Sequence, residues 1–168
     1  GPNFSVPVIP LAPGSSIMTA RVWSPTAGTP VRLKAEDAND ATHTVETQTL
    51  TTVAGGWETL VFDFANEAPG TEPLIHPDWT FSKVSIFFDF GNVGTGATYY
   101  LDDLTWPVTG GGGGGGTTAT LITFDEATAP VLTGFGGAVG TVVADPTNAS
   151  NMVAQVVTAA GAEIWAGT

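Results

Sequence analysis

The sequence predicts an all-β protein built as a two-sheet antiparallel sandwich. About ten short segments alternate between apolar and polar residues, which is the period of a half-buried strand. Turns rich in Gly, Pro and Asn separate these segments. No long segment has the apolar period of an amphipathic helix. Many short strands without helices are typical of a sandwich.

Six of the predicted strands precede a central run of glycines. Within 31–37, Val31, Leu33 and Ala35 share one face, and the polar residues share the other. The segment 66–80 contains three prolines and is predicted to be a loop. The six segments are 17–25, 31–37, 43–53, 57–64, 83–90 and 98–106.

Four further strands follow the glycines, and neither part of the chain is complete alone. Residues 3–107 and 119–168 would each leave sheet edges and an apolar face exposed. We therefore predict one domain over 1–168, with 108–118 as a tether that contains seven glycines. Such a tether spans roughly 15–18 Å, enough to join neighbouring strands. The four segments are 120–125, 140–145, 151–157 and 162–168.

The charge and the cysteine content exclude several classes of partner and site. Four Lys and Arg face 16 Asp and Glu, a formal net charge of −12. Nucleic acids and anionic membrane surfaces need clustered cations, so neither is an expected partner. No cysteine is present, which excludes disulfides and thiolate metal sites. No apolar run is long enough for membrane insertion.

Several motifs resemble a known kind of module. The stretches "VWSPTAGTPVRLKAEDA", "GGWETLVFDF", "KVSIFFDFG" and "TYYLDDL" resemble the C-terminal part of a sandwich module that accompanies secreted polysaccharide-degrading enzymes, notably of marine bacteria. The stretches "ITFDE", "GFGGAVGTVVADPTN", "NMVAQVV" and "WAGT" resemble the N-terminal part of the same module. The resemblance covers nearly the whole chain outside the glycines. It implies a jelly-roll carbohydrate-binding module that is secreted or held at the cell surface.

The two parts stand here in the reverse of the usual order. The resemblance therefore implies a circularly permuted chain, made by design or cut from a tandem array between equivalent points of two repeats. The glycines would then join the family's last strand to its first. A natural linker with half a domain on each side is the alternative. We expect a monomer, and a strand-swapped dimer would satisfy the same strands.

An outward-facing surface that combines tryptophan with charged residues is the predicted sugar site. Arg21 and Trp23 share one face of 17–25, and Lys34 and Glu36 share one face of 31–37. A flat aromatic ring covers the C–H face of a sugar, and charged groups bind its hydroxyls. Surface ion pairing is the alternative role for these charges. The predicted sugar-binding residues are Trp23, Trp165, Arg21, Lys34, Glu36 and Trp79.

Four acidic residues are the predicted ligands of a structural calcium ion. Asp125 and Glu126 end the family's first strand, and Asp102 and Asp103 lie in its last. These strands pair in such sandwiches, so the carboxylates should converge, and Ca²⁺ takes six to eight oxygen ligands. The resemblance supports calcium at this place. Capping of a turn without an ion is the alternative.

These observations predict a non-catalytic carbohydrate-binding module. The expected ligand is a polysaccharide, a β-glucan or a related algal or plant glycan. A calcium-stabilised structural or adhesion spacer without sugar affinity is the second hypothesis, and a small glycoside hydrolase is the third. His43 and His76 stand apart from any zinc-binding or nucleophile motif, so we do not expect an enzyme.

Overall fold

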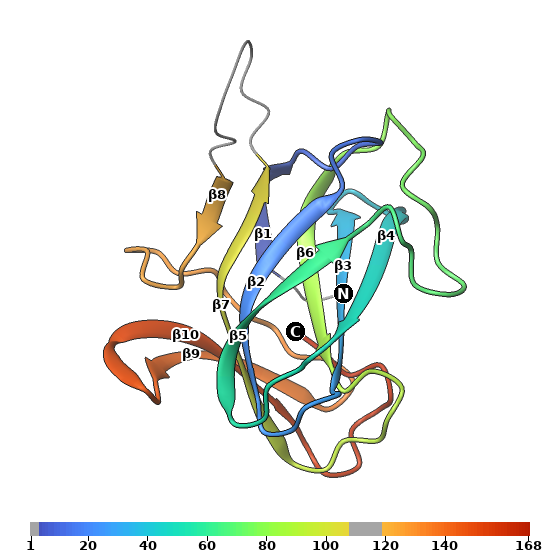
Figure 1. Ribbon diagram of the computed structural model, residues 1–168. Helices are drawn as coiled ribbons and strands as arrows, with labels where there is room; N and C mark the ends of the chain where they lie inside the picture. The colour runs from blue at the N-terminus through green and yellow to red at the C-terminus, as the bar shows by residue number, and fades with distance from the viewer. Residues whose placement is uncertain (1–3, 108–118) are drawn as a thin grey trace.

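The computed structural model describes residues 4–107 and 119–168, and these residues form ten β-strands and no helix (Figure 1). The all-β prediction is confirmed. The strand predicted at 162–168 is wrong, because this segment makes only an isolated bridge, from Gly167 to Phe135, and the strand at 4–9 was not predicted. None of the described segments could cross a membrane as a helix. The strands are β1 (Phe4–Ile9), β2 (Ile17–Ser24), β3 (Pro30–Asp37), β4 (Asp40–Leu50), β5 (Gly56–Asp63), β6 (Phe81–Phe88), β7 (Ala97–Pro107), β8 (Ala119–Ile122), β9 (Ala138–Asp145) and β10 (Asn148–Thr158).

The strands form two antiparallel sheets, consistent with the predicted sandwich (Figure 1). The smaller sheet has the order β1-β6-β3-β4. The larger sheet has the order β5-β2-β7-β10-β9, and β8 adds to it by pairing with β7. The predicted loop at 66–80 indeed contains no strand and follows β5.

The apolar faces of the two sheets meet in one core. On β3, Val31, Leu33 and Ala35 are completely buried, as their spacing predicts. On β2, Ala20 and Val22 are completely buried as well. Burying a side chain of the size of valine or leucine contributes about 1.5–3 kcal/mol, so these rows fix which face of each strand points inward.

The prediction that β2 and β3 share one outer surface is wrong. β2 lies in the larger sheet and β3 in the smaller, because the connection between them crosses from one sheet to the other. Arg21 and Trp23 therefore face outward on one side of the sandwich, whereas Lys34 and Glu36 face outward on the other. The alternation within a strand determines which residues face outward, but it does not determine the sheet to which the strand belongs.

Strands from both sides of the glycine run pair with each other. β7 pairs with β8, where Pro107 is the partner of Ala119 and Leu104 is the partner of Ile122. It also pairs with β10, where Leu101 is the partner of Ala154. The larger sheet is thus built from both parts of the chain. The predicted tether, 108–118, lies outside the described residues.

The first and last described segments meet along one edge of β6. The Ile86 amide donates to the Thr168 carbonyl at 2.7 Å, and the Thr168 amide donates back at 3.0 Å. Val84, two residues before Ile86 in β6, is the register partner of Phe4 in β1. Thr168 and β1 therefore follow one another along the same strand edge.

Cleavage of the chain between 108 and 118, at an inserted protease site, is expected to leave one compact particle. The two fragments share the β7–β8 and β7–β10 pairings and one core, so they should remain associated. Sedimentation before and after cleavage measures this. Separate fragments, an elongated two-lobed particle or an obligate dimer would contradict the single-domain prediction.

Candidate functional site

Three aromatic side chains form a row across the outer face of the larger sheet. Trp57 on β5 is the register partner of Trp23 on β2, which in turn is the partner of Tyr100 on β7. The Trp23 and Tyr100 rings lie 5.5 Å apart in an edge-to-face arrangement, and those of Trp57 and Tyr100 lie 6.3 Å apart. All three side chains are partly exposed. We call Trp57, Trp23 and Tyr100 the aromatic row.

Polar side chains border the aromatic row on two sides. Gln155, the register partner of Tyr100 on β10, donates from Nε2 to the Tyr100 hydroxyl at 3.4 Å. Arg21, the next outward residue on β2, places its guanidinium 4.4 Å from the centre of the Trp57 ring. A cation over an indole face is attracted to the ring, so Arg21 and Trp57 hold each other in place.

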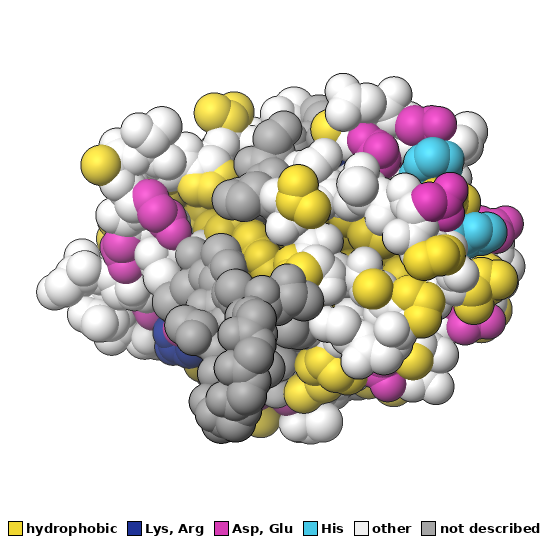
Figure 2. Space-filling model, turned by 90° about the horizontal axis from the view of Figure 1, so that it is seen from above, with side chains coloured by type: hydrophobic (Ala, Val, Ile, Leu, Met, Phe, Trp, Pro, Cys, Tyr) yellow, Lys and Arg dark blue, Asp and Glu magenta, His cyan; other side chains and the backbone are white. Residues whose placement is uncertain are grey.

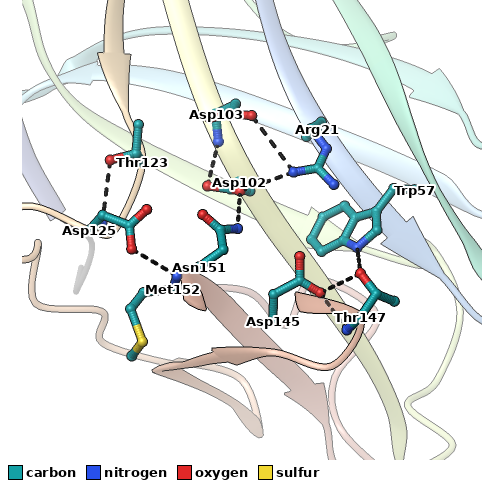
Figure 3. A network of polar contacts seen from close by, with 10 residues as sticks. All are labelled: Arg21, Trp57, Asp102, Asp103, Thr123, Asp125, Asp145, Thr147, Asn151 and Met152. Carbon is teal, nitrogen blue, oxygen red and sulfur yellow. Dashed lines mark hydrogen bonds and ion pairs between the residues drawn. The ribbon is translucent and has the colours of Figure 1, made fainter. Parts of the chain in front are cut away.

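A β-bulge in β7 presents two carboxylates to Arg21. Between the pairs Thr19–Thr105 and Arg21–Asp102, β7 contains one residue more than β2. Asp103 takes up the extra length with a φ of 47°, a left-handed conformation that aspartate tolerates better than most residues. The Arg21 Nη1 atom lies 3.3 Å from Asp102 Oδ2 and 3.8 Å from Asp103 Oδ2 (Figure 3).

The bulge coincides with a change of partner on the other edge of β7. β10 pairs with β7 as far as Leu101, and β8 pairs with it from Leu104 onward. In the gap between these partners, Asn151 donates from Nδ2 to Asp102 Oδ2 at 2.9 Å. The Asp102 side chain is almost completely buried here and also accepts from the Asp103 amide at 2.8 Å.

The turn between β9 and β10 reaches across to the aromatic row. Trp57 donates from Nε1 to Thr147 Oγ1 at 3.2 Å, although β5 and β9 are at opposite ends of the sheet order. Thr147 in turn donates from its amide and its hydroxyl to Asp145 Oδ1, each at 2.7 Å. Figure 3 shows the resulting polar network beside Trp57. The β9–β10 turn thus places polar groups beside Trp57, at one end of the row.

The two buried carboxylates of this network have pKa values shifted in opposite directions. Burial raises the pKa of Asp102, and the charge of Asp103 adds to this, against the hydrogen bond from Asn151 and the charge of Arg21. Burial also acts to raise the pKa of Asp145. There, however, hydrogen bonds from Thr147, Trp57 and Asn151 outweigh burial and hold the pKa below its usual value.

Asp102→Asn and Asp145→Asn should therefore affect stability with opposite pH dependence. Asp102 binds its proton more tightly in the folded state, so its contribution to the free energy of unfolding falls as pH rises above about 3.9. As pH rises from about 3 to 7, the free energy of unfolding of Asp102→Asn should therefore increase relative to that of the parent. Asp145 stabilises the fold above its unfolded pKa, so Asp145→Asn should lose relative stability over the same range. Urea unfolding at both pH values measures the two trends, and parallel trends would contradict the assignment.

The four predicted calcium ligands are engaged in protein contacts. Asp125 Oδ1 accepts from the Met152 amide at 2.9 Å, and Glu126 Oε1 accepts from the Thr123 amide at 2.7 Å. Asp102 and Asp103 face Arg21, so a cationic side chain already stands beside them. Among residues 4–107 and 119–168, no three acidic or histidine side chains form a group that could hold a metal ion. Calcium binding stays a prediction.

Lys34 and Glu36 lie on the opposite face, in a cluster of ion pairs. Lys34 Nζ is 2.6 Å from Glu36 Oε2, and Lys83 binds the other oxygen of Glu36. Arg32 Nη1 is 3.2 Å from Glu46 Oε2. Burial acts to raise the pKa of Glu36, but Lys34 and Lys83 offset this and keep the pKa low, so Glu36 stays ionised. The cross-strand ion pairing that was the alternative for these charges is therefore present.

The other two predicted platforms differ in exposure. Trp165 is 49% exposed and stacks on Phe135 with a ring distance of 6.3 Å. Trp79 is partly buried, and two imidazole rings stack on it, His76 at 4.0 Å and His43 at 4.6 Å. In Figure 2 the two histidines lie at one edge among acidic side chains. Because both imidazoles already cover Trp79, it anchors the loop and offers little surface to a sugar.

Most residues of this site lie outside the sequence prediction. Tyr100, Asn151, Gln155 and Trp57 are not among the residues that the sequence predicts. Trp57 and Tyr100 could have been found from their outward positions in alternating strands. Their meeting with Trp23 depends on the strand order, which no local pattern contains.

No protein-family model, curated protein or solved structure matches this chain.

Proposed function

We propose that this protein is a non-catalytic carbohydrate-binding module whose glycan lies along the aromatic row. The observation that carries the proposal is the alignment of Trp57, Trp23 and Tyr100 in one register row over three neighbouring strands. Adjacent strands are about 4.8 Å apart, so the row extends for about 10 Å. This length suits a short stretch of a polysaccharide better than a single sugar ring.

The chemistry of the surroundings also suits a neutral glycan. Aromatic faces cover the C–H faces of sugar rings, and amide or charged groups bind their hydroxyls. Gln155, Arg21 and Asn151 supply such groups beside the row. The two buried carboxylates, Asp102 and Asp145, are engaged in holding Arg21, Asn151 and Thr147 in position, which supports binding without hydrolysis.

The proposal includes the finer description of the fold. We infer a jelly-roll sandwich in circularly permuted order, from the motifs that resemble the two parts of such a module. The β7–β8 pairing across the glycine run supports it, as does the position of Thr168 beside β1 on the edge of β6. A β-glucan or related algal or plant glycan remains the proposed ligand, and a secreted or cell-surface location follows from that role.

Electrophoresis in gels that contain a polysaccharide tests the proposal. Laminarin or another neutral β-glucan is expected to retard the protein and to release no reducing sugar on incubation with it. Retardation should change little with salt, because a neutral ligand displaces few counterions. Release of sugar would favour the hydrolase hypothesis. Absence of binding on a broad glycan array would favour the spacer hypothesis.

A calcium-stabilised spacer remains the second candidate, because the motifs resemble modules that hold a structural calcium and because Asp102 and Asp103 lie side by side at Arg21. Asp102, Asp103 and Asp125 lie in one network at the junction of β7, β8 and β10 (Figure 3). An ion bound only by the folded state would raise the melting temperature as its concentration exceeds the dissociation constant. This hypothesis therefore requires a higher melting temperature in calcium than in EDTA. Equal melting temperatures would remove calcium from the proposal.

A further inference from the structure

We propose that the outer face of the smaller sheet is a second binding surface, and that its ligand is an anionic glycan. The surface combines a charged cluster with a chain of aromatic rings. We call Arg32, Lys34, Lys83, Glu36 and Glu46 the cationic cluster. It lies on the side of the sandwich opposite the aromatic row, so it does not depend on the proposed function.

The charge distribution of the chain favours an anionic ligand at this cluster. Three of the four cations of the chain belong to this cluster, together with only two carboxylates. The cluster therefore sums to +1, whereas the remaining 14 acidic residues and Arg21 sum to −13. In the view of Figure 2, acidic side chains are scattered over the surface and almost no Lys or Arg is visible. An anionic ligand would be repelled by most of this protein and accepted here.

Neighbouring side chains hold the cations of the cluster in place. Register pairs across β6, β3 and β4 place Lys83 beside Glu36 and Lys34 beside Glu46. Arg32 donates to Gln48 and Glu46 and stacks on Phe90 at 3.6 Å. These side chains are largely covered by their neighbours, with 11% of Arg32 and 10% of Lys83 exposed. A guanidinium and an ammonium that are already fixed need little ordering when a ligand binds.

A chain of aromatic rings leads from the cationic cluster to the half-exposed Trp165. Phe90 contacts Phe87 edge-to-face at 5.6 Å, and Phe87 contacts Phe135 in the same way at 5.5 Å. Phe135 then stacks on Trp165. A Cβ at Gly167 would lie 2.5 Å from the Ile86 carbonyl oxygen and 2.9 Å from Phe87 Cδ1, so glycine permits this close packing.

Together these features match an anionic saccharide in two ways. The exposed ring of Trp165 offers an apolar face to the sugar ring. Arg32 and Lys34 offer charged hydrogen-bond donors to a carboxylate or a sulfate ester. A guanidinium group binds the planar carboxylate and the tetrahedral sulfate well. Lys34 is the more accessible of the two, with 23% of its side chain exposed against 11% for Arg32.

Calorimetric titration with charged and neutral forms of the same oligosaccharide tests this surface. The probes are an oligouronate, its carboxyl-reduced form and a sulfated oligosaccharide of similar length. We expect the parent protein to bind at least one charged probe more tightly than the reduced form by several-fold, with affinity falling as salt is added. Comparison of the two charged probes identifies the preferred anion.

Variants on the two faces separate this proposal from the proposed function. Lys34→Gln and Trp165→Ala should each weaken binding of the charged probe several-fold and leave binding of a neutral β-glucan unchanged. Trp23→Ala should do the reverse. Equal binding of the charged and reduced probes, or unchanged binding in both Lys34→Gln and Trp165→Ala, would overturn the second surface. Loss of neutral binding in Trp165→Ala but not in Trp23→Ala would instead overturn the assignment of the aromatic row.

Discussion

Replacing Trp23 and Trp57 together by alanine is expected to weaken binding of a neutral β-glucan about tenfold or more. Each aromatic contact contributes roughly 0.5–1.5 kcal/mol beyond the area it buries, and two rings of the row are lost together. Removing Trp57 also frees Arg21 from the ring beneath it. Isothermal calorimetry with a soluble β-glucan measures the affinity. The single variants should each lose several-fold.

The double variant should remain folded, because Trp23 and Trp57 are partly exposed and lie outside the core. Val61→Ala is the matched control. Val61 faces outward on β5 like Trp57 but is 55% exposed and lies beyond the row, so its replacement should leave affinity unchanged. Parent-like affinity in the double variant would place the glycan elsewhere. A double variant that unfolds would show that these rings are structural.

Trp106→Ala is expected to destabilise the protein by about 3–5 kcal/mol, the usual cost of removing a large buried aromatic side chain. Trp106 on β7 is only 2% exposed and packs in the shared core of the two sheets. Urea unfolding at neutral pH measures the change. The loss is large compared with the total stability of an ordinary domain, so the variant should unfold at a clearly lower urea concentration.

Trp165→Ala is the comparison that separates a structural tryptophan from a surface one. Trp165 is half exposed, and substitution at such a position usually changes stability by less than about 1 kcal/mol. A loss as large as that of Trp106→Ala would show that Trp165 holds the C-terminal segment against Phe135. Trp165 would then be unsuited to the role proposed for the second surface.

The sequence alone predicted nine of the ten strands and the inward faces of the regular ones, but it missed β1 and placed a strand at 162–168 where none forms. Alternation in 31–37 separated Val31, Leu33 and Ala35, which are buried, from Lys34, which faces outward. This works because side chains in a strand point to opposite faces in turn, so a local pattern is enough. The incompleteness of each part of the chain likewise predicted that strands on both sides of the glycine run belong together. The β7–β8 pairing is consistent with this.

The tertiary structure alone decided which outward residues meet. The aromatic row forms because β5, β2 and β7 pair in that order. In the sequence, Trp57 and Tyr100 are 43 residues apart. Lys34 is separated from Trp23 for the same reason, since the chain crosses to the other sheet between them. The bulge at Asp103 and the hydrogen bond from Trp57 to Thr147 likewise depend on strands that are far apart in the sequence. Pairing between strands is non-local and is set by how the whole core packs, so no short stretch of sequence encodes it.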